Sequence, residues 1–98
     1  MQQSDRVISA LIIDDDPGIQ DMVSLAIELN WPKSSVYTAA DGLTGLDLAR
    51  EHTPDVVILD LGLPDIDGLE VCQTLRAESA IPIVMLTARD REIDIVKG

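Results

Sequence analysis

The sequence LIIDDDP, residues 11–17, joins an apolar run to three adjacent aspartates and a proline. The apolar residues predict the end of a buried strand, and Asp16 before Pro17 is typical of the cap and first residue of a helix. Two unit charges about 4 Å apart repel each other by ~1 kcal/mol in water and by ~4 kcal/mol near a protein surface. A chain with three aspartates at this junction therefore needs something that offsets their repulsion.

Short apolar runs alternate with helical periodicity along the rest of the chain. Runs rich in Val and Ile predict strands at Val7–Ile13, Val36–Ala39, Val56–Leu59 and Ile83–Leu86. Apolar residues at helical spacing lie between these runs, and Ile93 and Val96 predict the start of a fourth helix. This alternation predicts a single α/β domain over residues 1–98, with a parallel sheet covered by helices on both faces.

The composition limits the class of function. Eighteen acidic residues against seven basic ones give a net charge of −11, so divalent cations and basic protein surfaces are the expected partners, and nucleic acid is not. The single Cys72 allows no internal disulfide and falls in a helical pattern, where core packing is expected. No apolar run reaches the roughly 18 residues of a membrane span, and no signal peptide is visible. We expect a cytoplasmic protein without membrane contact.

Acidic side chains follow neighbouring strands of the predicted sheet. Asp14, Asp15 and Asp16 follow the first strand, Asp60 follows the third, and Thr87 ends the fourth. Ligands of such sheets bind outside the carboxyl ends of the strands, so these side chains are expected at one edge. Crowded carboxylates are stabilised by a cation, and Mg²⁺ prefers a few carboxylates together with waters that a phosphate can replace. The pattern predicts a magnesium site.

Three segments together carry a resemblance to a known family. LIIDDDP (residues 11–17), DVVILDLGLPDIDG (residues 55–68) and PIVMLTA (residues 82–88), in this order and spacing, resemble the receiver domain of two-component response regulators. The resemblance extends from about Val7 to the last residue. It implies a flavodoxin-like, doubly wound parallel sheet with strand order 2-1-3-4-5. Here the chain is expected to lack the fifth strand and the last helix.

The resemblance also implies roles for individual residues. Asp60 resembles the aspartate that accepts a phosphoryl group from a histidine kinase. Asp15 resembles the Mg²⁺ ligand, and Asp14 the neighbour that steadies metal-bound water. The main-chain carbonyl of Gly62 would be a further ligand, and Thr87 resembles the hydroxyl that switches on phosphorylation. Such a module is not an enzyme beyond catalysing its own phosphorylation and dephosphorylation.

Two further expectations concern partners. Residues 81–98, IPIVMLTARDREIDIVKG, most resemble receivers joined to winged-helix DNA-binding domains, so a longer parent chain is expected to regulate transcription. Only eleven residues follow Thr87, too few for the family's fifth strand and the lysine after it. The edge of the fourth strand, Ile83–Leu86, would then lie open, and an open apolar edge favours a homodimer.

Other interpretations stay open at this point. In a haloacid-dehalogenase-type phosphotransferase, Asp14 would be the nucleophile, with Asp16 and Thr87 in supporting positions, but residues 55–68 would then have no role. A receiver-like module that binds partners without phosphorylation is a second alternative. Within residues 55–68, Asp65 and Asp67 are expected to be turn and cap residues rather than metal ligands.

Overall fold

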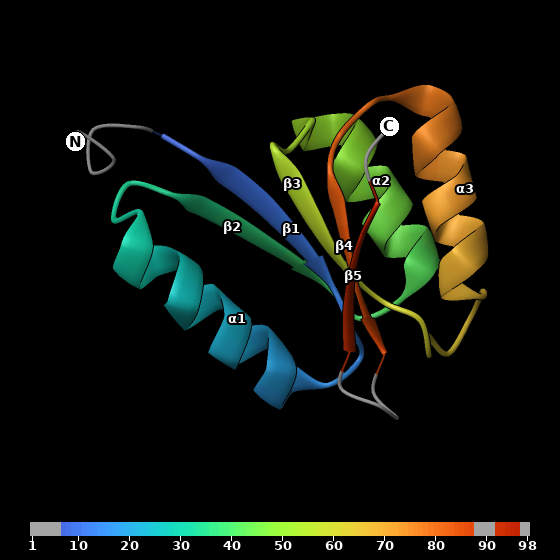
Figure 1. The fold of residues 1–98 in the computed structure, drawn as a ribbon, viewed down its shortest axis with the longest axis horizontal. Helices are drawn as coiled ribbons and strands as arrows, with labels where there is room; N and C mark the ends of the chain where they lie inside the picture. The colour runs from blue at the N-terminus through green and yellow to red at the C-terminus, as the bar shows by residue number, and fades with distance from the viewer. Residues whose placement is uncertain (1–6, 88–91, 97–98) are drawn as a thin grey trace.

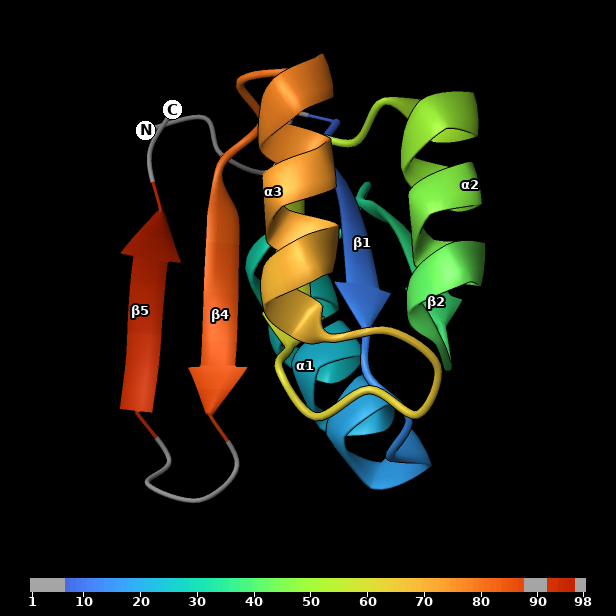
Figure 2. The ribbon, with the colours of Figure 1, turned by 90° about the vertical axis from the view of Figure 1, so that its right-hand side faces the viewer.

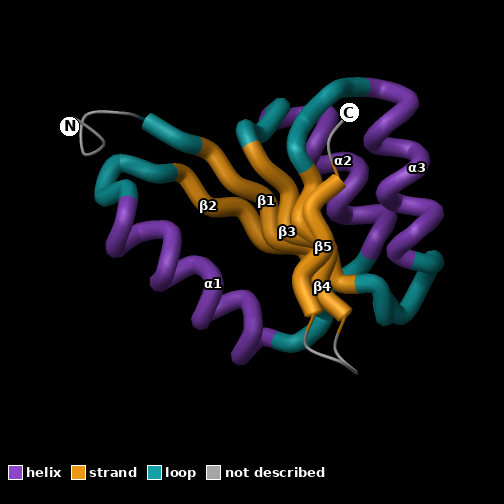
Figure 3. Tube along the Cα trace, viewed as in Figure 1, coloured by secondary structure: helices purple, strands orange, loops and turns teal. Residues whose placement is uncertain are grey.

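Strands and helices alternate through the computed structural model, which describes residues 7–87 and 92–96 (Figure 3). The elements are β1 (Ser9–Ile13), α1 (Pro17–Asn30), β2 (Ser35–Ala39), α2 (Gly42–His52), β3 (Val56–Asp60), α3 (Gly68–Glu78), β4 (Ile83–Thr87) and β5 (Glu92–Val96). They form one sheet with the order β2-β1-β3-β4-β5, in which β1 to β4 are parallel. The predicted α/β class and the order 2-1-3-4 of the parallel strands are confirmed. None of the described helices is long and apolar enough to cross a membrane.

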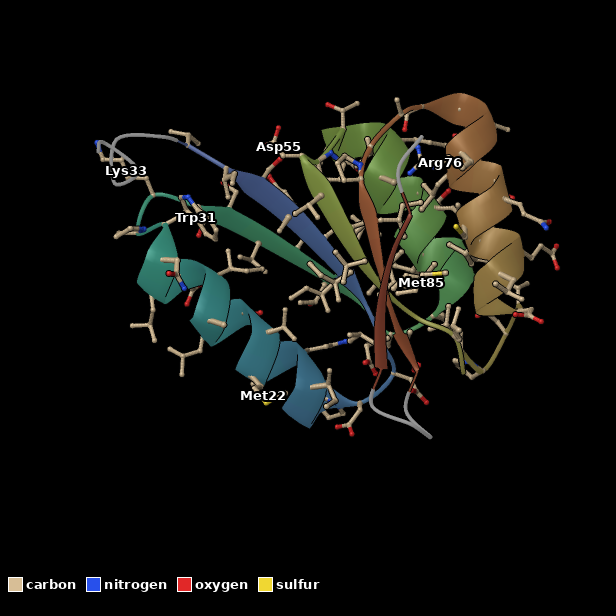
Figure 4. The ribbon with its side chains drawn as sticks, in the orientation of Figure 1. Met22, Trp31, Lys33, Asp55, Arg76 and Met85 are labelled. Atoms are coloured by element: carbon tan, nitrogen blue, oxygen red, sulfur yellow. The ribbon has the colours of Figure 1, made fainter. Side chains whose placement is uncertain are left out.

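Helices cover both faces of the sheet (Figure 1). α1 lies on one face, and α2 and α3 lie together on the other. Because strand side chains alternate, Leu11 and Ile13 face α2 and α3, where the main core lies. Cys72 is buried in this core, as expected, and Met85 points from β4 into the same layer (Figure 4). The buried members of the core are Leu11, Ile13, Ala39, Leu46, Ala49, Val57, Leu59, Val71, Cys72, Leu75 and Ile83.

An aspartate caps each of the three described helices at its N-terminus. The Asp16 side chain accepts a hydrogen bond from the Gly18 N–H at 2.8 Å, which confirms the predicted start of α1. Asp41 caps α2 and Asp67 caps α3 in the same way. Since each of these helices follows the carboxyl end of a strand, several of the chain's acids gather at that edge of the sheet.

The end of the chain differs from the prediction. Glu92–Val96 does not begin a fourth helix but forms β5, antiparallel to β4, with Val84 opposite Ile95. A parallel return needs a crossover of about a dozen residues or more, whereas residues 88–91 are enough only for an antiparallel return. The sequence Glu92-Ile93-Asp94-Ile95 also alternates acidic and β-branched residues, which is a strand period. The prediction of a fourth helix was therefore wrong. The strand that the chain was expected to lack is the parallel fifth strand of the family, whereas β5 is an antiparallel strand that was not predicted.

The edge of β4 is consequently not open. β5 pairs with β4 along its whole length, from Ile83 opposite Val96 to Thr87 opposite Glu92, and Figure 2 shows the two strands side by side. The backbone groups that were expected to recruit a second copy are used within the chain. The open edge on which the prediction of a homodimer rested is therefore closed within the chain, and dimerisation itself stays a prediction.

Candidate metal and phosphoacceptor site

The carboxyl ends of β1 and β3 bring two buried aspartates together in the middle of the sheet. Ile13 pairs with Leu59, so Asp14, which follows β1, lies beside Asp60, the last residue of β3. One carboxylate oxygen from each of Asp14, Asp15 and Asp60 lies within 4.8 Å of the others. The predicted convergence of these three acids is present in the structure.

The three acids differ in exposure. Asp14 is 4% exposed and Asp60 8%, whereas Asp15 is exposed to solvent. The Asp14 backbone N–H donates to the Ala39 carbonyl at 3.0 Å, and an Asp14 carboxylate oxygen accepts from the Asp16 N–H at 2.9 Å. Asp14 is therefore fixed in the protein, while Asp15 presents its carboxylate to the solution.

Gln20 was not singled out from the sequence. Its side-chain amide donates to the Asp14 carbonyl at 2.6 Å and to the Ala39 carbonyl at 3.4 Å, and so joins the first turn of α1 to the ends of β1 and β2. The only signal in the sequence is a polar residue beside the apolar face of the predicted helix, and that signal does not identify its partners.

The electrostatics of the site favour a cation. Burial raises the pKa of Asp14 above its ordinary value of 3.8, and the charges of Asp60, Asp15 and Asp16 raise it further. The hydrogen bond from the Asp16 N–H acts in the opposite direction. Carboxylates arranged in this way take up either a proton or a positive ion. Their hard oxygen donors fit a hard divalent cation such as Mg²⁺.

The loop between β3 and α3 begins at Asp60. The Gly62 N–H donates to the Asp60 carboxylate at 3.0 Å, and the Leu61 N–H donates to the Leu86 carbonyl of β4 at 3.3 Å. At the end of the loop, a Cβ on Gly68 would lie 2.5 Å from the Leu61 Cα and 2.7 Å from the Asp60 carbonyl oxygen. A glycine is required there because the two ends of the loop touch.

The other acids of this loop bind helix N-termini. Asp67 accepts from the Leu69 N–H at 2.9 Å and caps α3. Asp65 accepts from the Gly42 and Leu43 N–H groups at 2.8 and 2.9 Å, so it caps α2, a helix that precedes it in the chain. The expectation of capping roles is confirmed for both, although the sequence did not indicate which helix Asp65 would bind.

Thr87 ends β4 next to the site. Asp60 pairs with Leu86, so the backbone of Thr87 lies one residue beyond the partner of Asp60 on the adjacent strand. The side chain of Thr87 lies outside what the structure describes. Its position in the chain agrees with the expectation, and its role stays a prediction.

Comparison with known proteins identifies the family. The model of the response regulator receiver domain matches residues 10–98. The chain is 46% identical over 90 residues to the transcriptional regulatory protein AfsQ1 of Streptomyces coelicolor, covering 92% of this chain and 39% of that protein. It is 42% identical over 88 residues to the DNA-binding response regulator MtrA of Mycolicibacterium smegmatis, covering 90% and 38%. The chain thus spans about two fifths of the length of these relatives.

Solved structures show the same fold. The receiver domain of the Francisella response regulator 1452 superposes with a TM-score of 0.75 at 28% identity, covering 85% of this chain and 68% of that one. The chemotaxis protein CheY4 of Vibrio cholerae gives a TM-score of 0.74 at 33% identity, covering 83% and 68%. With the sheet order, the convergent aspartates and the family match in agreement, the chain belongs to the family of response regulator receiver domains.

Proposed function

We propose that this receiver domain is the phosphoacceptor of a two-component system, in which Asp60 takes a phosphoryl group from a histidine kinase. The observation that carries this proposal is the meeting of the Asp14, Asp15 and Asp60 carboxylates within 4.8 Å at the carboxyl edge of the sheet. A buried carboxylate with two acids beside it is suited to binding a cation and a phosphoryl group together.

Asp60 is the proposed nucleophile. Its carboxylate is held at the end of β3 by the hydrogen bond from the Gly62 N–H, which restricts the directions in which it can point. A carboxylate oxygen attacks the phosphorus of the kinase phosphohistidine, the P–N bond breaks, and its electron pair returns to the imidazole nitrogen. Mg²⁺, when bound, neutralises charge on the phosphoryl oxygens.

The proposed ligands of Mg²⁺ are Asp15, Asp60 and the main-chain carbonyl of Gly62. Asp15 is exposed, so it can bind a hydrated ion that arrives from solution. Asp14 is buried and one of its oxygens is occupied by the Asp16 N–H, which supports an indirect role through metal-bound water. Thr87, next to the partner of Asp60, is the proposed switch hydroxyl.

The partners follow from the family and the charge. A net charge of −11 favours a basic docking surface on the kinase and gives this segment no affinity for nucleic acid. Because relatives are named as transcriptional and DNA-binding regulators, a longer parent chain would regulate transcription through another domain.

We propose a cytoplasmic location, which the free, buried Cys72 supports. Catalysis is limited to the domain's own phosphorylation and dephosphorylation.

The two alternatives receive less support. A haloacid-dehalogenase-type reaction would use Asp14 as nucleophile, yet Asp14 is the most buried of the three acids and is hydrogen-bonded to the Asp16 N–H. A receiver-like module without phosphorylation would have no use for a complete acidic set. Membership of the receiver family favours the main interpretation over both.

Phosphorylation by a small-molecule donor tests the proposal. With acetyl phosphate and Mg²⁺, the wild-type chain should gain one labile phosphoryl group per molecule, measured by intact-protein mass spectrometry. Asp60→Asn should abolish the gain. Asp67→Asn removes the same charge from the same loop but keeps a good helix cap, so it should retain the gain. Equal labelling of wild type and Asp60→Asn would refute the proposal.

A further inference from the structure

We propose that Asp65 is a positioning residue for the metal site, because it fixes the loop that carries Gly62 by binding the N-terminus of α2. The inference rests on the proposed function, since the ion concerned is the Mg²⁺ of the phosphoacceptor site. Asp65 itself lies outside the cluster formed by Asp14, Asp15 and Asp60. It acts through the backbone between itself and Asp60.

The contact between Asp65 and α2 uses both carboxylate oxygens. One oxygen accepts from the Gly42 N–H at 2.8 Å and the other from the Leu43 N–H at 2.9 Å. The next N–H, of Thr44, donates to Asp41 at 2.7 Å. The bonds from Gly42 and then Leu43 lower the pKa of Asp65 below its ordinary value of 3.8. The side chain is therefore ionised at neutral pH and matched to the positive end of the helix.

Packing reinforces this contact. A Cβ on Gly42 would lie 2.5 Å from the Ile66 Cγ1, so the Ile66 side chain occupies the space that the missing Cβ leaves. The residue next to Asp65 thus rests on the same turn of α2 that Asp65 binds. In Figure 2, the loop between β3 and α3 lies below the N-terminal end of α2.

The same loop is also held at its base. The Leu61 N–H donates to the Leu86 carbonyl and the Gly68 N–H to the Leu61 carbonyl, both at 3.3 Å. Gly62 therefore lies on a short piece of chain between two anchors, Leu61 at the sheet and Asp65 at α2. Release of the second anchor would leave the Gly62 carbonyl free to move away from the ion, and would loosen the N–H that orients Asp60.

A matched pair of variants isolates the role of Asp65. Asp65→Asn and Asp67→Asn each remove one negative charge from the same loop, so the net charge of the chain changes by the same amount in both. Asparagine remains a good cap at position 67, but at position 65 it offers one acceptor oxygen to two N–H groups. Loss of residues that orient metal ligands typically costs 10–100-fold in affinity. We expect the Mg²⁺ dissociation constant to rise about tenfold more for Asp65→Asn than for Asp67→Asn, measured by calorimetric titration.

A second measurement needs no variant. In the wild-type chain, Mg²⁺ should shift the amide NMR signals of Gly42 and Leu43 together with that of Gly62, because Asp65 connects them. Equal dissociation constants for the two variants would overturn the role of Asp65 and leave the proposed function intact. The role of Asp65 would also be overturned if Mg²⁺ shifted the amide signal of Gly62 but not those of Gly42 and Leu43. A wild-type chain that binds no Mg²⁺ would overturn both proposals.

Discussion

Asp14 belongs to the candidate metal site, and its buried charge lowers the stability of the folded protein. It is buried beside other acids, and its raised pKa means that the folded protein holds an ionised carboxylate there only with difficulty. A bound cation would relieve this cost, since it replaces the lost hydration and opposes the neighbouring charges. In the metal-free protein the site therefore lowers the stability of the folded state, and a bound cation would reduce this loss.

Replacement of Asp14 should therefore stabilise the metal-free protein. Asp14→Asn keeps an acceptor oxygen for the Asp16 N–H and removes the buried charge. At neutral pH, without Mg²⁺, the free energy of unfolding should rise by the order of 1 kcal/mol, or about 4–8 °C in Tm. Asp16→Asn is the control, because it removes an exposed charge next to the cluster and remains a good cap. Its effect should be smaller.

The pH dependence has a definite sign. Because the pKa of Asp14 is higher in the folded state than its ordinary 3.8, the folded protein binds more protons in this range. The contribution of Asp14 to stability therefore falls as pH rises from about 3.8 through the raised pKa. In urea unfolding across this range, the free energy of unfolding of the wild type should fall relative to that of Asp14→Asn as the pH rises. Identical profiles for the two proteins would contradict the raised pKa.

Among single residues, the sequence predicted correctly which side chains meet at the ends of strands. Asp14, Asp15 and Asp60 could be predicted to meet because the end of an apolar strand fixes where the next residue lies. Gln20 and Asp65 could not be assigned their partners, because a hydrogen bond to a backbone group elsewhere in the fold leaves no spacing in the sequence.

Close packing between α2 and β1 holds the site in place, in addition to the hydrogen bonds. A Cβ on Gly45 of α2 would lie 2.5 Å from the Cδ1 and 2.7 Å from the Cγ1 of Ile13, which is fully buried. Gly45 thus lets α2 approach β1 at the residue directly before Asp14. The position of the first acid depends on this contact.

Gly45→Ala should consequently destabilise the fold. Overpacking of a filled core typically costs about 1–3 kcal/mol, although alanine is the better residue in an isolated helix. The pair Gly45→Ala and Ile13→Ala forms a double-mutant cycle, because Ile13→Ala deletes the three atoms that the new Cβ would meet. We expect the double variant to be more stable than the sum of the single effects, measured by chemical unfolding. Strict additivity would show that the two residues do not compete for space.

β5 shows the limit of prediction for an element. Glu92–Val96 contains apolar residues that fit either a short helix or a strand, and the spacing of Ile93 and Val96 favoured the helix. Pairing with the available edge of β4 decides in favour of the strand, since tertiary contacts override local propensity. By contrast, the four parallel strands were predictable because short apolar runs alternate regularly with capped helices.

At the scale of the whole molecule, the sheet order explains why the acids form one site. β1 and β3 are central neighbours, so both present their carboxyl ends at the same point, and α2 and α3 begin close by with their own acidic caps. The net charge of −11 is thus partly concentrated where a cation and a phosphoryl group would bind. In the proposed function, Asp60 is the group on which this arrangement acts.

Mapping the phosphoryl group within the chain tests this claim most directly. The wild-type protein would be treated with acetyl phosphate with and without Mg²⁺, the acyl phosphate reduced with borohydride to mark the modified aspartate, and the peptides sequenced by mass spectrometry. Our account predicts a mark on Asp60 alone, and only with Mg²⁺. A mark on Asp14, or labelling that does not require Mg²⁺, would contradict it.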